Sequence, residues 1–174
     1  MPSASLPTPR VLTPARIAFL ALIVATLAQT AWYYPRLPAR VASHFDAAGQ
    51  ANAFMPKDAF FMVQLGVLVL MALVFLIMPA LVARLPPAMI NLPNKDYWLA
   101  PERRAHTARK LESFLVGFGN VMLLFLLLVC RAAMQANLLP SPHLSDRIWV
   151  LLILLGVWCI FWTVRLVRAF RLPD

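Results

Sequence analysis

Charged residues are scarce in this chain of 174 residues. Only 13% of them are Asp, Glu, Lys or Arg, whereas a soluble globular domain carries about 25%. Hydrophobic residues make up 61%, and this apolar fraction excludes an intrinsically disordered chain. The composition therefore points away from an ordinary soluble protein and toward a protein that lies in a membrane.

Four long runs hold no charged residue at all. They cover residues 17–35, 59–83, 113–130 and 148–164, with 19, 25, 18 and 17 residues. A helix that crosses the hydrocarbon core of a bilayer, about 30 Å thick, needs about 20 predominantly apolar residues. We therefore predict an all-α integral membrane bundle of four transmembrane helices, at about 16–34, 59–85, 101–136 and 147–170. The four helices form a single membrane domain, 16–172.

The amino-terminal residues 1–15 contain four prolines and are predicted to form a disordered cytoplasmic tail. A signal peptide is the alternative for the first run, because Thr26-Leu27-Ala28 could be a cleavage site. However, the apolar run continues to Pro35, whereas the hydrophobic region of a signal peptide has about 7–15 residues. This length favours an uncleaved first helix.

Basic residues are distributed unevenly among the segments outside the runs. Of the 16 lysines and arginines, 11 fall in residues 1–16, 84–110 and 165–171. The positive-inside rule then places both termini and a loop at 86–100 in the cytoplasm, and a loop at 35–58 outside. Since flanking basic residues explain the net charge of +9, we expect membrane lipid as a partner and no nucleic acid.

Cysteine is also rare. Cys130 is predicted at the outer end of the third helix, and Cys159 lies roughly 16 Å deeper in the fourth, at about 1.5 Å per residue. Because the Cα atoms of bridged cysteines lie within about 7 Å of each other, we expect no disulfide between them.

The known catalytic patterns are missing. The chain has no Gly-rich phosphate loop, no Gly-x-Ser-x-Gly and no His-Glu-x-x-His, so we predict a protein that is not an enzyme and has no cofactor. A weak metal site, as in a metal-dependent membrane hydrolase, could combine the outer residues His44, Asp46, His143 and Asp146. Roles for these four residues in turns and helix caps are favoured, because their spacing is loose.

The outer loop 35–58 has a residue pattern that differs from that of a flexible linker. Val41, Phe45, Phe54 and Met55 are apolar anchors in it, and residues 46–49 resemble a turn in which a glycine takes positive φ. We expect a compact, hairpin-like cap on the outer surface, with a partner-binding site at His44, Phe45, Asp46 and Gly49.

Polar residues within the runs are few. Gln29, Gln64 and Asn120 are amides, and Asn120 could pair with Gln64 or Gln29 across helices. Packing between helices is the favoured role, since no run contains an ionisable group of the kind that marks a substrate path. Pro79 is expected to kink the second helix, and Pro101 followed by Glu102 predicts the start of the third.

Two motifs resemble a known family. They are Leu37-Pro38 with His44-Phe45-Asp46-Ala47-Ala48-Gly49 and Lys57, and then Asn91-Leu92-Pro93-Asn94-Lys95-Asp96-Tyr97-Trp98-Leu99. Over residues 17–104 the chain resembles bacterial small membrane proteins of the domain of unknown function 1648 family, and also the amino-terminal half of the SdpI bacteriocin immunity and signalling proteins. The resemblance implies a multi-pass protein of the bacterial cytoplasmic membrane. It marks, besides the outer loop, a cytoplasmic site at Asn91, Pro93, Asn94, Lys95, Asp96, Tyr97 and Trp98.

The resulting hypothesis is a non-enzymatic bacterial inner-membrane protein. It would bind a peptide or protein partner through its outer loop, with an SdpI-like role in immunity or signalling by resemblance. The alternative is a small transporter or channel-type protein, which could form a homo-oligomer built around the intramembrane amides. The two hypotheses differ in where the functional residues lie, since the first places them in loops and the second inside helices.

Overall fold

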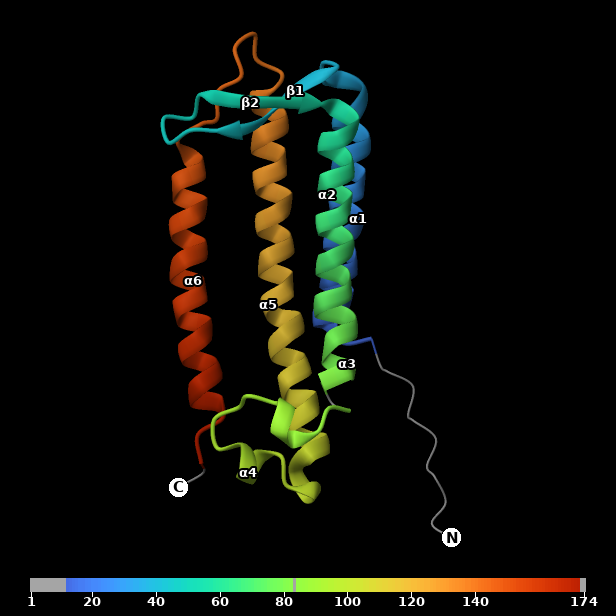
Figure 1. The fold of residues 1–174 in the computed structure, drawn as a ribbon, viewed down its shortest axis with the longest axis vertical. Helices are drawn as coiled ribbons and strands as arrows, with labels where there is room; N and C mark the ends of the chain where they lie inside the picture. Colours follow the sequence, from blue (N-terminus) through green and yellow to red (C-terminus); the bar gives the residue numbers. More distant parts are fainter. Residues whose placement is uncertain (1–11, 83, 173–174) are drawn as a thin grey trace.

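The structure is a computed structural model that describes residues 12–82 and 84–172. Within these ranges, four helical spans are long and apolar enough to cross a membrane. They stand side by side (Figure 1): α1 (Pro14–Tyr33), α2 (Lys57–Ala72) with its continuation, α5 (Pro101–Ala136) and α6 (Arg147–Ala169). This confirms the predicted all-α bundle of four transmembrane helices, and the chain is a multi-pass membrane protein.

The helix α1 begins two residues before the predicted start at 16. The Thr13 hydroxyl accepts a hydrogen bond from the Arg16 N–H at 3.3 Å, and Pro14 occupies the first turn. A threonine cap followed by proline is a favourable helix start, because the cap satisfies an N–H and the proline does not need one. Pro14 and Ala15 therefore belong to the helix, and residues 1–11 of the predicted disordered tail lie outside the described residues.

The second span is continuous but irregular. After α2 it passes through a π-helical turn, η2 (Leu73–Ile77), into α3 (Met78–Val82), and the Met78 N–H bonds Leu73 O, five residues back. Pro79 has no N–H to donate to a hydrogen bond, and its ring would clash with the carbonyl of Phe75 in a regular α-helix. A wider turn ahead of the proline removes that clash, so the irregularity lies just before Pro79, where the kink is predicted.

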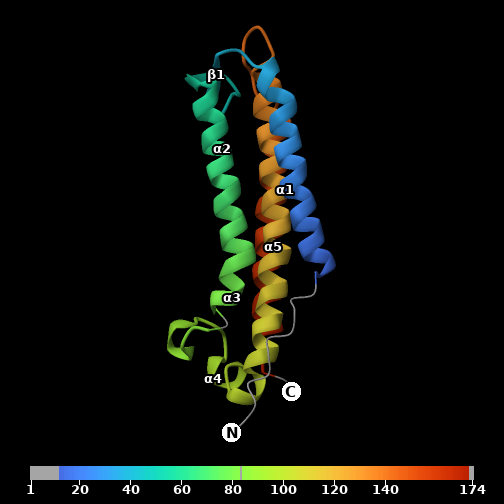
Figure 2. The same ribbon diagram turned by 90° about the vertical axis from the view of Figure 1, so that its right-hand side faces the viewer.

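Helix α5 stands at the centre of the bundle, and α1 packs along it (Figure 2). Gly119 makes the closest approach: a Cβ atom there would lie 2.6 Å from Phe75 Cγ and 2.8 Å from Phe19 Cε2. Gly119 therefore allows close helix packing, since no side chain fits between these rings.

Helix α6 is attached differently. None of its described residues is buried, and it meets α5 through aromatic rings. The ring centroids of Trp162 and Phe114 lie 5.1 Å apart, and those of Trp162 and Phe118 lie 6.0 Å apart. Such tilted pairs add to the burial of their own area, but most of α6 faces outward.

A β-hairpin covers one end of the bundle, which we call the hairpin end (Figure 1). It follows the 3-10 turn η1 (Tyr34–Arg36). Strand β1 (Arg40–Phe45) pairs antiparallel with β2 (Ala51–Pro56), with Val41 opposite Met55 and Ala42 opposite Phe54. The hairpin-like cap predicted from loop 35–58 is thus confirmed as a two-stranded sheet that lies across the ends of the helices.

The opposite end, which we call the loop end, carries the connection between α3 and α5. It contains the short helices η3 (Pro87–Met89) and α4 (Lys95–Trp98). Leu12 and Leu172, the first and last described residues, belong to this end as well, because the chain crosses the bundle four times. Helix α5 begins at Pro101, as Pro101 and Glu102 predict.

Candidate functional site

The hairpin is fixed to the bundle through the inner face of its strands. Val41 is fully buried and packs in a cluster with Leu37, Phe61 and Met134, and Met55 adds to this cluster from β2. Along β2, half-buried residues alternate with exposed ones, as in a sheet with one buried face. In β1 the adjacent residues Val41 and Ala42 are both buried. Burial of this face holds the hairpin against the ends of α2 and α5.

Asn137, at the carboxy-terminal end of α5, adds a polar attachment. Its Oδ1 accepts the Ala42 N–H at 2.6 Å, and its Nδ2 donates to Ala42 O at 3.0 Å and to Ala133 O at 2.9 Å. Asn137 is 5% exposed, and its amide bonds both main-chain groups of Ala42, as a neighbouring strand would. Sequence reasoning missed it, and the available signal was an amide placed directly after a spanning helix.

The turn of the hairpin uses two of the predicted site residues as structure. The Asp46 carboxylate accepts N–H groups of Ala48 and Gln50 at 2.9 and 2.8 Å. Gly49 has φ 77°, and its N–H donates to Asp46 O at 3.0 Å. The predicted turn at 46–49 is therefore confirmed.

Gly49 also meets the loop between α5 and α6. Its carbonyl accepts the Leu144 N–H at 2.8 Å, and a Cβ atom at Gly49 would lie 2.3 Å from Leu144 O. Only glycine fits this conformation and this approach. The contact ties the tip of the hairpin to the loop that leads into α6.

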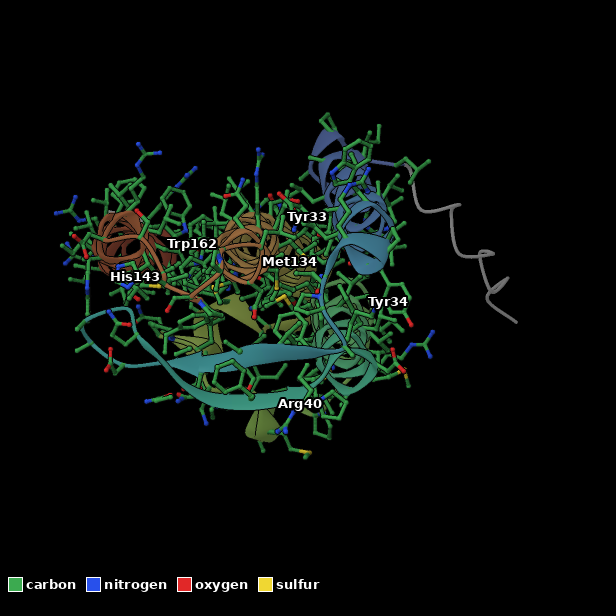
Figure 3. All side chains as sticks on the ribbon, turned by 90° about the horizontal axis from the view of Figure 1, so that it is seen from above. Tyr33, Tyr34, Arg40, Met134, His143 and Trp162 are labelled. Carbon is green, nitrogen blue, oxygen red and sulfur yellow. The ribbon has the colours of Figure 1, made fainter. Side chains whose placement is uncertain are left out.

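Several residues of the hairpin strands stay exposed. Arg40, His44, Asn52 and Phe54 are exposed, and Phe54 keeps 47% of its surface accessible. Figure 3 shows Arg40 pointing away from the helices. Phe45, the other predicted site residue, is half-buried at the end of β1. We call Arg40, His44, Asn52 and Phe54 the hairpin surface.

The weak metal site does not assemble. Among the described residues, no group of three or more His, Cys, Asp or Glu side chains could hold a metal ion. Asp46 is engaged in the turn, and the His143 ring lies against Gly49. Asp146 caps no N–H of α6 with its side chain, and His44 contacts the Ser43 hydroxyl at 3.2 Å.

The three intramembrane amides do not pair with one another, so the predicted pairing of Asn120 with Gln64 or Gln29 is wrong. Gln29 donates to Leu127 O at 3.0 Å, Gln64 donates to the Thr30 hydroxyl at 2.9 Å, and Asn120 donates to Ala15 O at 3.0 Å. Each bond joins α1 to a neighbouring helix: Gln29 reaches α5, Gln64 reaches α1 from α2, and Asn120 reaches α1 from α5. These bonds use the amide nitrogens, whereas Gln64 Oε1 and Asn120 Oδ1 are buried without a hydrogen-bond partner among the described residues.

The residues of the second motif close the carboxy-terminal end of α6. Asn94 Nδ2 and Trp98 Nε1 both donate to Phe170 O, at 3.0 and 2.9 Å. Lys110 donates to Ala169 O, and its ammonium lies 4.3 Å from the centroid of the Trp98 ring. Terminal helix carbonyls need such donors, and a cation there also complements the helix dipole. We call Asn94, Trp98 and Lys110 the α6 clamp.

The remaining motif residues surround this clamp. Asn94 has φ 52°, which turns the chain into α4, and Tyr97 lies under the Arg103 guanidinium, 3.8 Å from its ring centroid. The others stay exposed at the loop end, namely Asn91, Pro93, Lys95 and Asp96. Lys110 and Phe170 were not identified from the sequence, because both lie far from the motif along the chain.

Residues 21–83 match a family model, described as Domain of unknown function (DUF1648). This segment belongs to the DUF1648 family. The match runs from α1 through the hairpin into the region after α3, so it includes the hairpin surface, whereas the motif at 91–99 lies outside it. The predicted family is confirmed, over a shorter part of the chain than the expected 17–104. Neither a curated protein nor a solved structure matches the chain.

The two cysteines are both free. Cys130 lies in α5 among the residues that pack against the Val41 cluster, and Cys159 lies in α6. The absence of a disulfide between these two residues agrees with their expected difference in depth.

Proposed function

We propose that this protein with a DUF1648 segment is a non-enzymatic protein of the bacterial inner membrane that binds a peptide or protein partner through the hairpin surface. One observation carries the proposal. The hairpin is held by buried apolar residues, by Asn137 and by Leu144, while the side chains of Arg40, His44, Asn52 and Phe54 stay exposed. The bundle thus presents a fixed surface at the membrane boundary.

The composition of this surface supports a binding role. Arginine and aromatic residues dominate the binding energy of many interfaces, since they bury a large area and offer directional contacts. A surface that is already ordered loses little conformational entropy on binding. Within the described residues, no hydrogen bond or ion pair occupies the Arg40 side chain, so its guanidinium can serve a partner.

The proposal assigns different roles to the predicted site residues. His44 belongs to the binding face, whereas Asp46 and Gly49 shape the turn that orients it. Phe45 is half-buried and contributes less direct contact. The motif at 91–99 serves chiefly to hold α6, and an SdpI-like role in immunity or signalling would then depend on the hairpin surface alone.

The transporter or channel alternative has less support. Gln29, Gln64 and Asn120 each bond α1 to a neighbouring helix, which is a packing role rather than the lining of a path. A homo-oligomer remains compatible with the proposal, because most of α6 faces outward.

Affinity capture from native membranes tests the proposal. The triple variant Arg40→Ala, His44→Ala, Phe54→Ala should lose a partner that the wild-type protein retains, at an equal level in the membrane. The control variant Leu139→Ala, Arg147→Ala removes exposed residues from the other loop of the same end and should keep the partner. If the triple variant captures the same partner as the wild type, the hairpin surface is not the binding site.

A further inference from the structure

Strand β2 has one edge that no other described strand pairs with. Its residues are exposed or half-buried, whereas Val41 and Ala42 of β1 are fully buried, so β2 is the outer strand of the hairpin. The other edge of the hairpin is already occupied, because the amide of Asn137 bonds the N–H and the C=O of Ala42. The hairpin is therefore closed on the side of α5 and open along β2.

The register of the two strands shows which main-chain groups lie on the open edge. Residues directly opposite each other in an antiparallel pair either bond each other or direct both main-chain groups away from each other. Ala42 lies opposite Phe54, and both main-chain groups of Ala42 point to Asn137. Phe54 therefore directs its own N–H and C=O to the open edge. The bond from Lys57 N–H to Ala39 O, at 2.9 Å, fits the same alternation.

The edge at Phe54 is open to a partner. Among the described residues, no group from outside the hairpin bonds the N–H or the C=O of Phe54. Residues 51–55 carry no charge, so β2 lacks the charged side chains that protect many edge strands from pairing. Pro56 has no N–H and ends the edge. The open edge is thus short and centred on Phe54.

A positive charge lies beside this edge. Arg40 is two residues from Ala42 along β1, and Ala42 lies opposite Phe54, so Arg40 and Phe54 share one face of the sheet. Within the described part of the chain, the Arg40 guanidinium has no hydrogen bond or ion pair. Long side chains reach diagonal neighbours on an adjacent strand. The charge of Arg40 therefore lies near any chain that pairs with Phe54.

We propose, on the basis of the binding role assigned above to the hairpin surface, that the partner binds by strand addition. An extended, acidic peptide segment pairs with β2 at Phe54, and its carboxylate meets Arg40. A strand supplies an acceptor for the Phe54 N–H and a donor for the Phe54 C=O. A phospholipid phosphate offers acceptors only and would leave the C=O unpaired. A second copy of this chain, paired through its own β2, would bring a second Arg40 instead of a carboxylate.

Hydrogen exchange of two adjacent amides in nanodiscs tests the open edge. The register directs the N–H of Met55 to β1 and that of Phe54 outward. Phe54 should exchange at least about fivefold faster, the factor for one net hydrogen bond. The synthetic peptide acetyl-Thr-Val-Glu-Val-Thr-amide, at millimolar concentration, should slow Phe54 and leave Met55 unchanged. Equal exchange of the two amides without peptide, or no slowing of Phe54 with it, would overturn the proposal.

Two substitutions at one residue separate the main chain from the ring. Phe54→Ala and Phe54→Pro both remove the ring, but only proline removes the N–H, and an edge strand tolerates proline where that N–H faces outward. In fluorescence anisotropy, the labelled peptide should bind Phe54→Pro about fivefold more weakly than Phe54→Ala. Slow exchange of Met55 in both variants shows that the hairpin is intact. Equal affinities would exclude strand addition, even where affinity capture supports the hairpin surface.

The acidic preference is tested at Arg40. The wild-type protein should bind the glutamate peptide up to about fivefold more tightly than its glutamine analogue, and Arg40→Gln should remove this difference. Arg147→Gln, at an exposed residue of the other loop of the same end, is the control and should keep it. Equal binding of the two peptides by the wild type would contradict the role of Arg40. Protection of Phe54 by self-association without peptide would replace the peptide by a second copy of the chain.

Discussion

Asn137 and Ala42 lie 95 positions apart in the chain and are joined by two hydrogen bonds, at 2.6 and 3.0 Å. The amide of Asn137 thereby completes the main-chain hydrogen bonding of a buried residue in β1. This bond couples the hairpin to α5, the central helix. The position of the hairpin surface therefore depends on a residue that is not part of the hairpin.

Removing this amide should loosen the hairpin. Asn137→Ala leaves the N–H and C=O of Ala42 buried without partners, and each such group costs about 1–3 kcal/mol. We expect a lower free energy of unfolding in mixed micelles and faster hydrogen exchange in residues 40–45. Gln135→Ala, an exposed neighbour on the same helix, is the control. Unchanged exchange in residues 40–45 of Asn137→Ala would contradict the assigned role.

Gly119 should not tolerate a side chain. Gly119→Ala places a Cβ atom 2.6 Å from Phe75 and forces the packed rings apart, at a cost of about 1–3 kcal/mol. Gly66→Ala is the matched control, because nothing lies within 4 Å of a Cβ atom there. Thermal unfolding in detergent should show a lower midpoint for Gly119→Ala and none of that loss for Gly66→Ala. Equal midpoints for the two variants would mean that the contact with Phe75 is not tight.

The α6 clamp predicts that the protein loses stability when a single N–H group is removed. Trp98→Phe keeps an aromatic ring near Lys110 but removes the indole N–H that bonds Phe170 O. We expect a destabilisation of about 1 kcal/mol, measured by denaturant unfolding, since one neutral hydrogen bond is lost.

The neighbouring Tyr97→Phe is the control for this prediction. It retains the ring under Arg103 and removes a hydroxyl that makes no hydrogen bond within the described residues. Its free energy of unfolding should stay close to that of the wild type. A loss as large as that of Trp98→Phe would argue against the clamp.

Arg16 and Glu112 form an ion pair that ties the start of α1 to α5, with side chains 12% and 31% exposed. A double-mutant cycle with Arg16→Gln and Glu112→Gln should give a coupling free energy of about 1 kcal/mol, because the pair is only partly withdrawn from water. The coupling should fall at high salt. Additive effects of the two substitutions would show that the pair contributes nothing to stability.

Much of the fold could be predicted from local pattern. The four uncharged runs fix the spans, and Pro101 with Glu102 gives the start of α5. The hairpin could be predicted from apolar residues in a polar loop and from a glycine at a position where a turn is expected. These features depend on residues close together in the chain, so composition and spacing reveal them.

The contacts between distant segments could not be predicted in the same way. The bond of Asn137 to Ala42, the clamp of Lys110 on Ala169 and the separate partners of the three amides depend on which helices become neighbours. Sequence spacing alone does not decide this. For the same reason, the predicted site at 44–49 divides into exposed residues and a turn only when the surroundings of each side chain are known.

Photo-crosslinking at two adjacent residues of β2 tests the central claim most directly. A photoreactive residue at Phe54 lies on the hairpin surface, whereas one at Met55 faces the buried cluster. The account predicts that, in native membranes, Phe54 captures a discrete protein or peptide and Met55 gives only crosslinks within the chain. Capture of the same partner from both positions, or of lipid alone from Phe54, would contradict a binding role for this surface.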